Sequence, residues 1–361
     1  MRRLVRLAVV LAFALAGGLV PAAHAGRHLL FGVADDTLKW TPDPLPFLAD
    51  AHDLGVGAVR VTLPWRGLRA AASDDAVLTR LDAASSLTRI VVEIGGGPGS
   101  TPPRTRRQRA AYCSYVGSFL RSHRNVRDVV IWLEPNEPLF WRHPDAGAYE
   151  RLLARCYDVA HAVRPDVNVI SSAGPHARVR GAVAPGLWYR RVGDALRASH
   201  RRRPIFDTVG HNAYPDSPFE GPWTTHDGPS IDQGDYAKLL AALRTAFRGT
   251  AQPLPGRRGV TIWYLEDGYQ SSVDGHEDAY VGRENVAVVL DPGFANLQLA
   301  SSIWLAYCQP LVGALFNFQL RDDTSLRGWQ SGVLYADGKR KRGYLLVRQV
   351  LASAAAGTLE C

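Results

Sequence analysis

The sequence of 361 residues lacks the signatures of several common enzyme classes. It contains no HExxH pattern of a zinc protease and no GxSxG pattern of a serine hydrolase. It also contains no CxxC pair or His/Cys cluster with the spacing of metal ligands. The glycine-rich segment GGGPGSTPP lacks the Gly-Lys-Ser/Thr ending of a phosphate-binding loop. We therefore expect neither a metal nor another cofactor.

Lysine is also scarce, because only four of the 42 basic residues are lysines. The formal charge of +8 is therefore carried almost entirely by arginine. The basic clusters at 201–203 and 339–342 are short, far apart in the sequence and free of interleaved aromatic residues. A solvated loop is the expected structure for each cluster, and we predict no nucleic-acid partner.

The apolar run Leu7–Val20 falls short of the roughly 18 residues that a membrane-spanning helix needs. It follows three arginines and precedes the small-x-small pattern Ala23-His24-Ala25. This order predicts a signal peptide over residues 1–25. We therefore expect a secreted or extracytoplasmic protein without a stable membrane anchor. Loss of the three arginines would lower the formal charge from +8 to +5.

Eight short apolar segments alternate with longer segments in which apolar residues recur every three or four positions. This alternation predicts a parallel sheet covered by helices. Eight such units favour a single-domain (β/α)8 TIM barrel of the α/β class over residues 26–361, with an open doubly wound sheet as the alternative. The predicted strands are 29–36, 56–63, 88–96, 126–134, 166–174, 205–214, 259–267 and 311–320.

The chain has an even number of cysteines: Cys113, Cys156, Cys308 and Cys361. In an exported protein this number permits two disulfides. Three pairings are possible, and four buried thiols also fit the sequence. We favour Cys113–Cys156 and Cys308–Cys361, because each pair would join neighbouring outer elements of the predicted barrel.

Polar side chains occupy the ends of several predicted strands, which is where barrel enzymes place their chemistry. Glu134 ends the fourth predicted strand and Glu266 lies near the end of the seventh, so the two would face each other across the barrel. Arg60 lies on the second predicted strand. Two opposed carboxylates with an arginine and aromatic residues nearby are typical of a glycosidase.

Five segments resemble clan A glycoside hydrolases, especially family 39 and its actinobacterial cellulase-like relatives. The segment IWLEPNEPLFW resembles their fourth-strand signature WNEPNxxxFW, and IWYLEDGYQSS resembles the seventh-strand segment that bears their nucleophile. The segments DTVGHNAYP, VRVTLPW and FQLRDD…GWQSGVLYADGKRKRGY resemble their sixth strand, second strand and last strand with its loop. The resemblance extends, with gaps, from Phe31 to Tyr344.

The resemblance implies a retaining glycoside hydrolase that cleaves a β-linked saccharide or glycoconjugate. With the predicted signal peptide the enzyme would be exported, and we expect it to be a monomer. Glu266 would be the nucleophile and Glu134 the acid/base, with their carboxyl groups about 5–5.5 Å apart. Counting back from Phe140-Trp141 favours Glu134 over Glu137, because the alternative would place Pro135 inside a central strand. The implied substrate-binding residues are Asp35, Arg60, Trp65, Asn136, His211, Asn212, Tyr214 and Trp329.

One position departs from the family pattern. Leu133 stands where the family has an asparagine that contacts the sugar 2-hydroxyl, and leucine cannot make that contact. Either another donor such as Asn136 replaces it, or the site accepts a different sugar, or activity has been lost. The alternative function is therefore a non-catalytic barrel that binds carbohydrate.

Overall fold

The computed structural model describes residues 29–65, 67, 75–97, 101–284 and 286–361, so the predicted signal peptide lies outside the described residues. The strands are β1 Leu30–Ala34, β2 Ala58–Pro64, β3 Arg89–Gly95, β4 Asp128–Ile131, β5 Asn168–Ile170, β6 Val209–His211, β7 Ile262–Asp267 and β8 Val312–Phe318. The helices are α1 Thr37–Trp40, α2 Leu45–Leu54, α3 Asp75–Ser85, α4 Arg106–Ser122, α5 Ala146–Val163, α6 Pro185–Ala198, α7 Tyr236–Phe247, α8 Pro292–Cys308 and α9 Tyr344–Ala356, and the described residues also include the short 3₁₀ helix η2 Glu277–Ala279.

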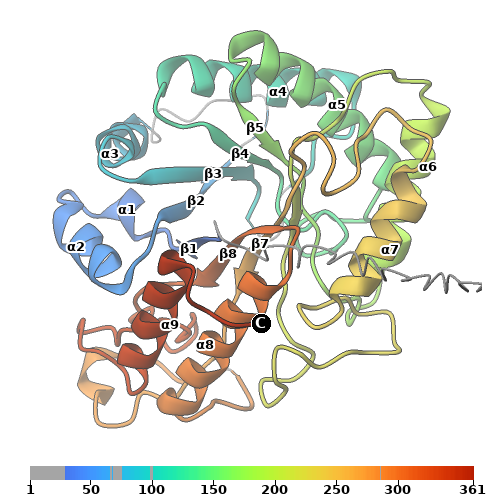
Figure 1. Ribbon diagram of the computed structural model, residues 1–361. Helices are drawn as coiled ribbons and strands as arrows, with labels where there is room; N and C mark the ends of the chain where they lie inside the picture. The colour runs from blue at the N-terminus through green and yellow to red at the C-terminus, as the bar shows by residue number, and fades with distance from the viewer. Residues whose placement is uncertain (1–28, 66, 68–74, 98–100, 285) are drawn as a thin grey trace, which may run out of the picture.

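The eight strands form a parallel barrel that the helices surround (Figure 1). The strand order is β5-β4-β3-β2-β1-β8-β7-β6, and every pairing is parallel. A parallel bridge between Ile170 and Thr208 joins the two edge strands. The predicted (β/α)8 barrel is confirmed. Strands β5 and β6 contain only three residues each.

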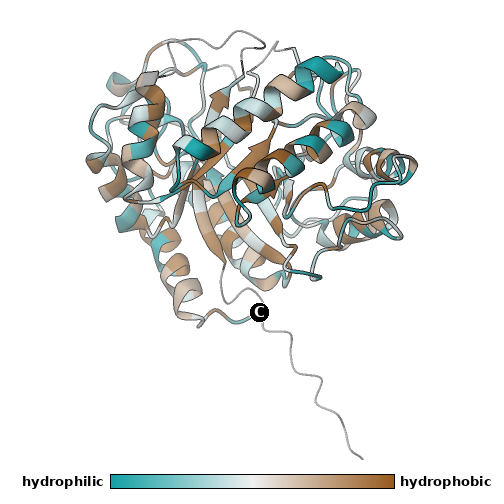
Figure 2. Cartoon of the chain, turned by 90° about the horizontal axis from the view of Figure 1, so that it is seen from above, coloured by the Kyte–Doolittle hydropathy of each residue, from teal (hydrophilic) through white to brown (hydrophobic). Residues whose placement is uncertain are grey.

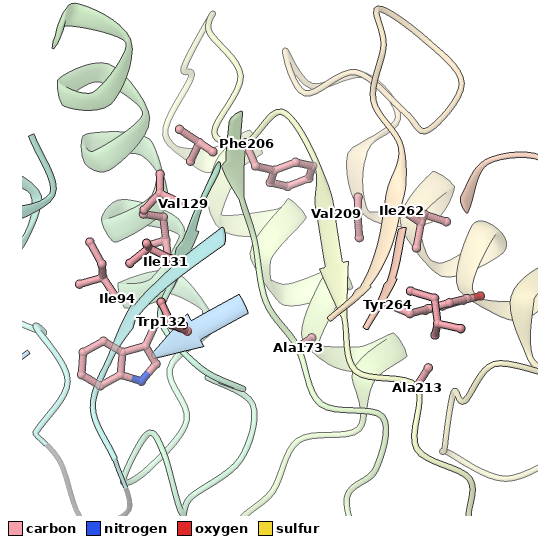
Figure 3. Packing of buried hydrophobic residues seen from close by; sticks show 14 of the residues in the cluster. Ile94, Val129, Ile131, Trp132, Ala173, Phe206, Val209, Ala213, Ile262 and Tyr264 are labelled. Atoms are coloured by element: carbon pink, nitrogen blue, oxygen red, sulfur yellow. The ribbon is translucent and has the colours of Figure 1, made fainter. Parts of the chain in front are cut away.

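Apolar residues pack in two layers, one inside the barrel and one between the sheet and the helices. Figure 2 shows the hydrophobic residues gathered on the central strands, with hydrophilic residues on the outer sides of the helices. Figure 3 shows part of the outer layer, which includes Val129 on β4 and Ile262 on β7. In the inner layer, a Cβ atom at Gly32 would lie 2.3 Å from the Phe316 ring. Glycine at this position therefore allows Phe316 to fill the barrel centre.

The structure contains both of the disulfides that we favoured. Cys113 and Cys156 join α4 to α5 in the outer layer, and Cys308 joins the end of α8 to Cys361. Within the described residues, no helix combines the length and the apolar character that crossing a membrane requires.

We predict that the two disulfides contribute comparably to stability. Cys113 and Cys156 lie 43 residues apart in the sequence, and Cys308 and Cys361 lie 53 residues apart. Closing a loop of either length lowers the entropy of the unfolded chain and so stabilises the fold by about 4 kcal/mol. A double Cys→Ala variant of either pair should lose most of that free energy of unfolding, measured by urea denaturation. A loss below about 1 kcal/mol for either variant would contradict this prediction.

Candidate active site

Glu134 lies just beyond β4, where the backbone departs from the extended conformation. The strand ends at Ile131, earlier than predicted, and Trp132 and Glu134 have φ angles of 69° and 32°. Positive φ is uncommon for residues other than glycine and marks a constrained backbone. The Trp132 ring packs against Trp141 in the outer layer. The Glu134 side chain instead meets residues that follow β5 and β6.

The residues that follow β5 and β6 enclose the Glu134 carboxyl group. Its Oε1 accepts a hydrogen bond of 2.6 Å from Asn212 Nδ2, and its backbone N–H donates to Ser172 Oγ at 3.1 Å. A Cβ atom at Gly174 would lie 2.9 Å from Glu134 Cδ. Glycine at 174 therefore makes room for the carboxyl group.

This environment favours the protonated form of Glu134. Burial and the nearby charge of Glu266 raise the pKa of Glu134 to about 8, although the hydrogen bond from Asn212 acts in the opposite direction. A carboxyl group that keeps its proton at neutral pH can donate it to a leaving group.

Glu137, the other acidic residue of the motif, lies in a different environment. Its backbone N–H donates to Glu134 O at 2.8 Å, which closes a turn after β4. Burial alone raises the pKa of Glu137 to about 7. Only Glu134 combines the contact with Asn212 and the influence of Glu266, which favours Glu134 as the reactive residue.

Glu266 reaches the barrel interior because β7 contains an irregularity. Between Tyr264 and Asp267, β7 advances three residues while β8 advances two. The flanking side chains of Tyr264 and Asp267 face α8, where they bond Gln309 and Ser302. A bulge of this kind redirects a side chain, so Glu266 turns toward the centre of the barrel.

Both Glu266 carboxylate oxygens accept hydrogen bonds from side chains that the sequence analysis placed in the site. Arg60 donates to Oε1 from β2, and the Tyr214 hydroxyl donates to Oε2 at 3.0 Å. Burial, and after it the charge of Glu266, raises the pKa of Tyr214 well above its usual value. The hydroxyl therefore keeps its proton and remains a donor to Glu266.

Glu93, which is not among the residues predicted for the site, accepts a hydrogen bond from the other terminal nitrogen of Arg60. Glu93 lies on β3 and is fully buried. Burial raises the pKa of Glu93 to about 8, against the opposing effect of Arg60. Burial would also favour loss of the Arg60 proton, but the carboxylates of Glu93 and Glu266 raise the pKa of Arg60 above its usual value. The signal in the sequence is a single acidic residue within the apolar segment RIVVEIG.

Asn136 and His211, which we predicted to bind substrate, use their polar groups inside the protein. Asn136 is fully buried, and its amide bonds the backbone of Gly174 and of Val183. The His211 ring lies between the Tyr189 hydroxyl at 3.1 Å and a backbone carbonyl at 2.7 Å. Burial lowers the pKa of His211 to about 4. These two residues therefore support the loops around Glu134, and we leave them out of the substrate contacts.

Asp35 and Trp65 are likewise buried, whereas Trp329 is open to solvent. Asp35 accepts hydrogen bonds from the backbone N–H groups of Thr37 and Leu320. The Trp65 ring is 8% exposed and packs in the outer layer. Trp329 is 46% exposed and packs edge-on against Phe318.

The Phe318 ring in turn packs against Tyr214, the partner of Glu266. Trp329, Phe318 and Tyr214 therefore form a line of aromatic rings that leads outward from Glu266. Of the predicted substrate-binding residues, Trp329 thus offers the open ring face for stacking.

Among the described residues, one group has the spacing of metal ligands: Glu220, His226 and Asp232 in the loop between β6 and α7. The His226 ring already lies 3.1 Å from Asp235 Oδ2 and 3.3 Å from Glu220 Oε2. Burial opposes the charged imidazole, but the surrounding carboxylates raise the pKa of His226. An ion-paired histidine accounts for this group, and we assign no metal to it.

Comparisons with known proteins show a likeness in fold to glycoside hydrolases. No protein-family model and no curated protein matches the sequence. The structure is similar to a family 39 glycoside hydrolase from the gut symbiont Bacteroides cellulosilyticus, with a TM-score of 0.63 and 17% identity, over 91% of this chain and 64% of that chain. It is also similar to a glucosidase from Croceicoccus marinus, with a TM-score of 0.61 and 14% identity, over 92% of this chain and 68% of that chain. A GH39 beta-xylosidase from Caulobacter crescentus is similar with a TM-score of 0.58 and 17% identity, over 91% of this chain and 72% of that chain.

The chain thus covers less than two thirds of the length of the first of these enzymes. The resemblance that the sequence motifs suggested is confirmed at the level of the fold.

We predict that replacing Glu134 by Gln stabilises the protein more at pH 8 than at pH 5. The unfolded chain releases the Glu134 proton near pH 4.5, whereas the folded protein keeps it until about pH 8. Unfolding therefore releases a proton between these values, and the wild type loses stability as the pH rises. Thermal unfolding of both proteins at the two pH values measures the difference. A difference in Tm that does not change with pH would show that Glu134 titrates normally.

Proposed function

We propose that this protein is a retaining glycoside hydrolase that acts on a β-linked saccharide or glycoconjugate. The observation that carries the proposal is the contrast between Glu134 and Glu266. Glu134 has a pKa raised to about 8, while Glu266 accepts hydrogen bonds from a buried arginine and a tyrosine. One carboxyl group is thus prepared to donate a proton, and two donors hold the other in place to attack, which fits the division of roles that the reaction requires.

In the first step, a Glu266 carboxylate oxygen forms a bond to the anomeric carbon as the bond to the leaving oxygen breaks. Glu134 gives its proton to that leaving oxygen. In the second step, Glu134 takes a proton from water, and the water oxygen displaces Glu266 from the anomeric carbon. Burial and, after it, the charge of Glu266 raise the pKa of Glu134. In the intermediate the ester at Glu266 carries no charge, so the second effect is removed and the pKa of Glu134 falls, which allows the same residue to act as a base.

Within this site, Asn212 positions the Glu134 carboxyl group and Tyr214 orients Glu266. Trp329 would stack against the sugar or its aglycone. Asn212 also has acceptor capacity left, because its Oδ1 has no hydrogen-bond partner among the described residues. The Asn136 amide already makes hydrogen bonds to the backbone. Asn212 is therefore our candidate for the sugar contact that an asparagine at position 133 makes in family 39.

The alternative proposal is a barrel that binds carbohydrate without cleaving it. Leu133 favours this alternative, because its partly exposed side chain precedes Glu134 and offers no hydrogen bond to a sugar hydroxyl. We also propose that the protein is exported as a monomer after removal of residues 1–25. Two disulfides support an oxidising compartment.

The mature protein should release dinitrophenol from at least one member of a panel of 2,4-dinitrophenyl β-glycosides. Glu266→Gln should lower kcat/KM by roughly 10⁴-fold or more, because it removes the nucleophile. Glu134→Gln should lose roughly 10² to 10⁴-fold on methylumbelliferyl glycosides, which need protonation of the leaving group. The same variant should lose far less in the first turnover of the dinitrophenyl compounds.

Glu137→Gln is the matched control, because it makes the same change on a neighbouring carboxyl group. We expect it to keep kcat/KM within about threefold for both kinds of substrate. If Glu137→Gln instead shows the dependence on the leaving group, the acid/base is Glu137. If the folded wild type turns over no member of the panel but binds glycans measurably, the hydrolase proposal is wrong and the carbohydrate-binding barrel is supported.

A further inference from the structure

Glu93 and Arg60 form a buried connection between β3 and the nucleophile candidate on β7. Arg60 gives one terminal nitrogen to Glu93 Oε2 and the other to Glu266 Oε1. The side chains of Glu93 and Arg60 are 0% and 3% exposed. In the sheet, β2 and β3 are neighbours, whereas β1 and β8 separate β2 from β7. The Arg60 side chain therefore crosses the barrel interior to reach Glu266, and Glu93 holds it from the side of β3.

A second arginine–carboxylate pair in the barrel shows what a purely structural pair looks like. Arg89 binds Asp128 through two parallel hydrogen bonds of 2.8 Å, and Asn168 bonds the same carboxylate at 2.9 Å. This pair lies at the start of β3 and β4, at the opposite end of the barrel from Glu134. In this bidentate geometry both carboxylate oxygens of Asp128 accept a hydrogen bond from Arg89.

The Arg60 pair is arranged differently. Its guanidinium divides its terminal nitrogens between Glu93 and Glu266, while Arg60 Nε and Glu93 Oε1 have no hydrogen-bond partner among the described residues. Buried polar atoms without partners cost stability. A pair selected for stability alone would join Arg60 Nε to Glu93 Oε1 by a hydrogen bond. We therefore infer that the guanidinium is oriented for its contact with Glu266.

We propose that Glu93 is a positioning residue, which fixes the Arg60 guanidinium across the barrel so that it orients the Glu266 carboxylate for attack. This inference rests on the proposed function, in which Glu266 is the nucleophile. Without Glu93, the guanidinium has no hydrogen-bond acceptor on β3 and can move away from the Glu266 carboxylate. The nucleophile would then keep its hydrogen bond from Tyr214 but lose its fixed orientation.

Glu93→Ala, Glu93→Gln and Asp128→Asn test this role. Asp128→Asn is the matched control, because it alters an equally buried carboxylate that pairs with an arginine outside the site. The probes are 2,4-dinitrophenyl 2-deoxy-2-fluoro-β-glycosides of glucose, galactose and xylose, which trap the glycosyl ester on the nucleophile. The amplitude of the dinitrophenol burst counts intact sites, and its rate reports on the attack of Glu266.

We expect Glu93→Ala to keep a burst of about one dinitrophenol per protein but to slow its rate at least 100-fold. Glu93→Gln keeps an acceptor for Arg60 and should recover the rate to within about tenfold of wild type. Asp128→Asn should keep the wild-type rate within about threefold. A merely structural Glu93 would lower the amplitude in Glu93→Ala and leave the rate unchanged, and that result would overturn the inference.

A crystal structure of Glu93→Ala separates this inference from the proposed function. If the wild type is not trapped by any probe, the proposed function fails, but the position of Arg60 can still be read. A guanidinium that has moved away from Glu266 would support the positioning role of Glu93. A guanidinium that still bonds Glu266 as in the wild type would overturn it.

Discussion

The contact between the Arg60 guanidinium and the Glu266 carboxylate is the interaction on which the site depends. Both groups are taken out of water by the barrel, and burial of a charge is tolerated only when an opposite charge and hydrogen bonds compensate it. Arg60, which lies on β2, supplies that compensation to Glu266 on β7 and to Glu93 on β3. Such a buried set of charges is weak support for stability in general. The contact of Arg60 with Glu266, which lies near the end of β7, instead indicates a chemical role.

The rim of the site is held by a second buried cation, Lys341. Its amino group donates to Asp322 Oδ1 at 2.7 Å, to Ser271 Oγ at 2.8 Å and to the Gln330 carbonyl at 2.9 Å. These bonds use all three of its donors and connect the loops that follow β7 and β8. Trp329 is the neighbour of Gln330, so the exposed ring is presented by a fixed backbone. Glu93 and Glu266 thus lie on strands and Glu134 just beyond one, whereas the exposed aromatic ring lies on a restrained loop.

The sequence predicts the fold well, because strand and helix periodicity is local and is repeated eight times. It also predicts the two carboxylates, Arg60 and Tyr214, which the structure brings together. It fails where the outcome depends on partners far away in the sequence. Asn136 and His211 have the residue types of a sugar site, but whether a polar group meets the substrate or the backbone is decided by the loops packed around it.

Glu93, in contrast, belongs to the site but was not predicted from the sequence. An acidic residue in an apolar strand is visible in the sequence, but its partner on β2 appears only when the sheet is assembled. The bulge in β7 is equally hidden, since regular alternation from Leu265 would turn Glu266 away from the barrel interior.

The most direct measurement is the mass of the protein after reaction with a dinitrophenyl 2-deoxy-2-fluoro-β-glycoside, followed by digestion and mapping of the labelled peptide. The account predicts one fluoroglycosyl group per chain, bound to the peptide that contains Glu266. A label on another carboxylate, Glu134 included, would contradict the assignment of the nucleophile. A folded protein that stays unlabelled by every sugar tested, and that turns over none of the parent glycosides, would contradict the retaining mechanism itself.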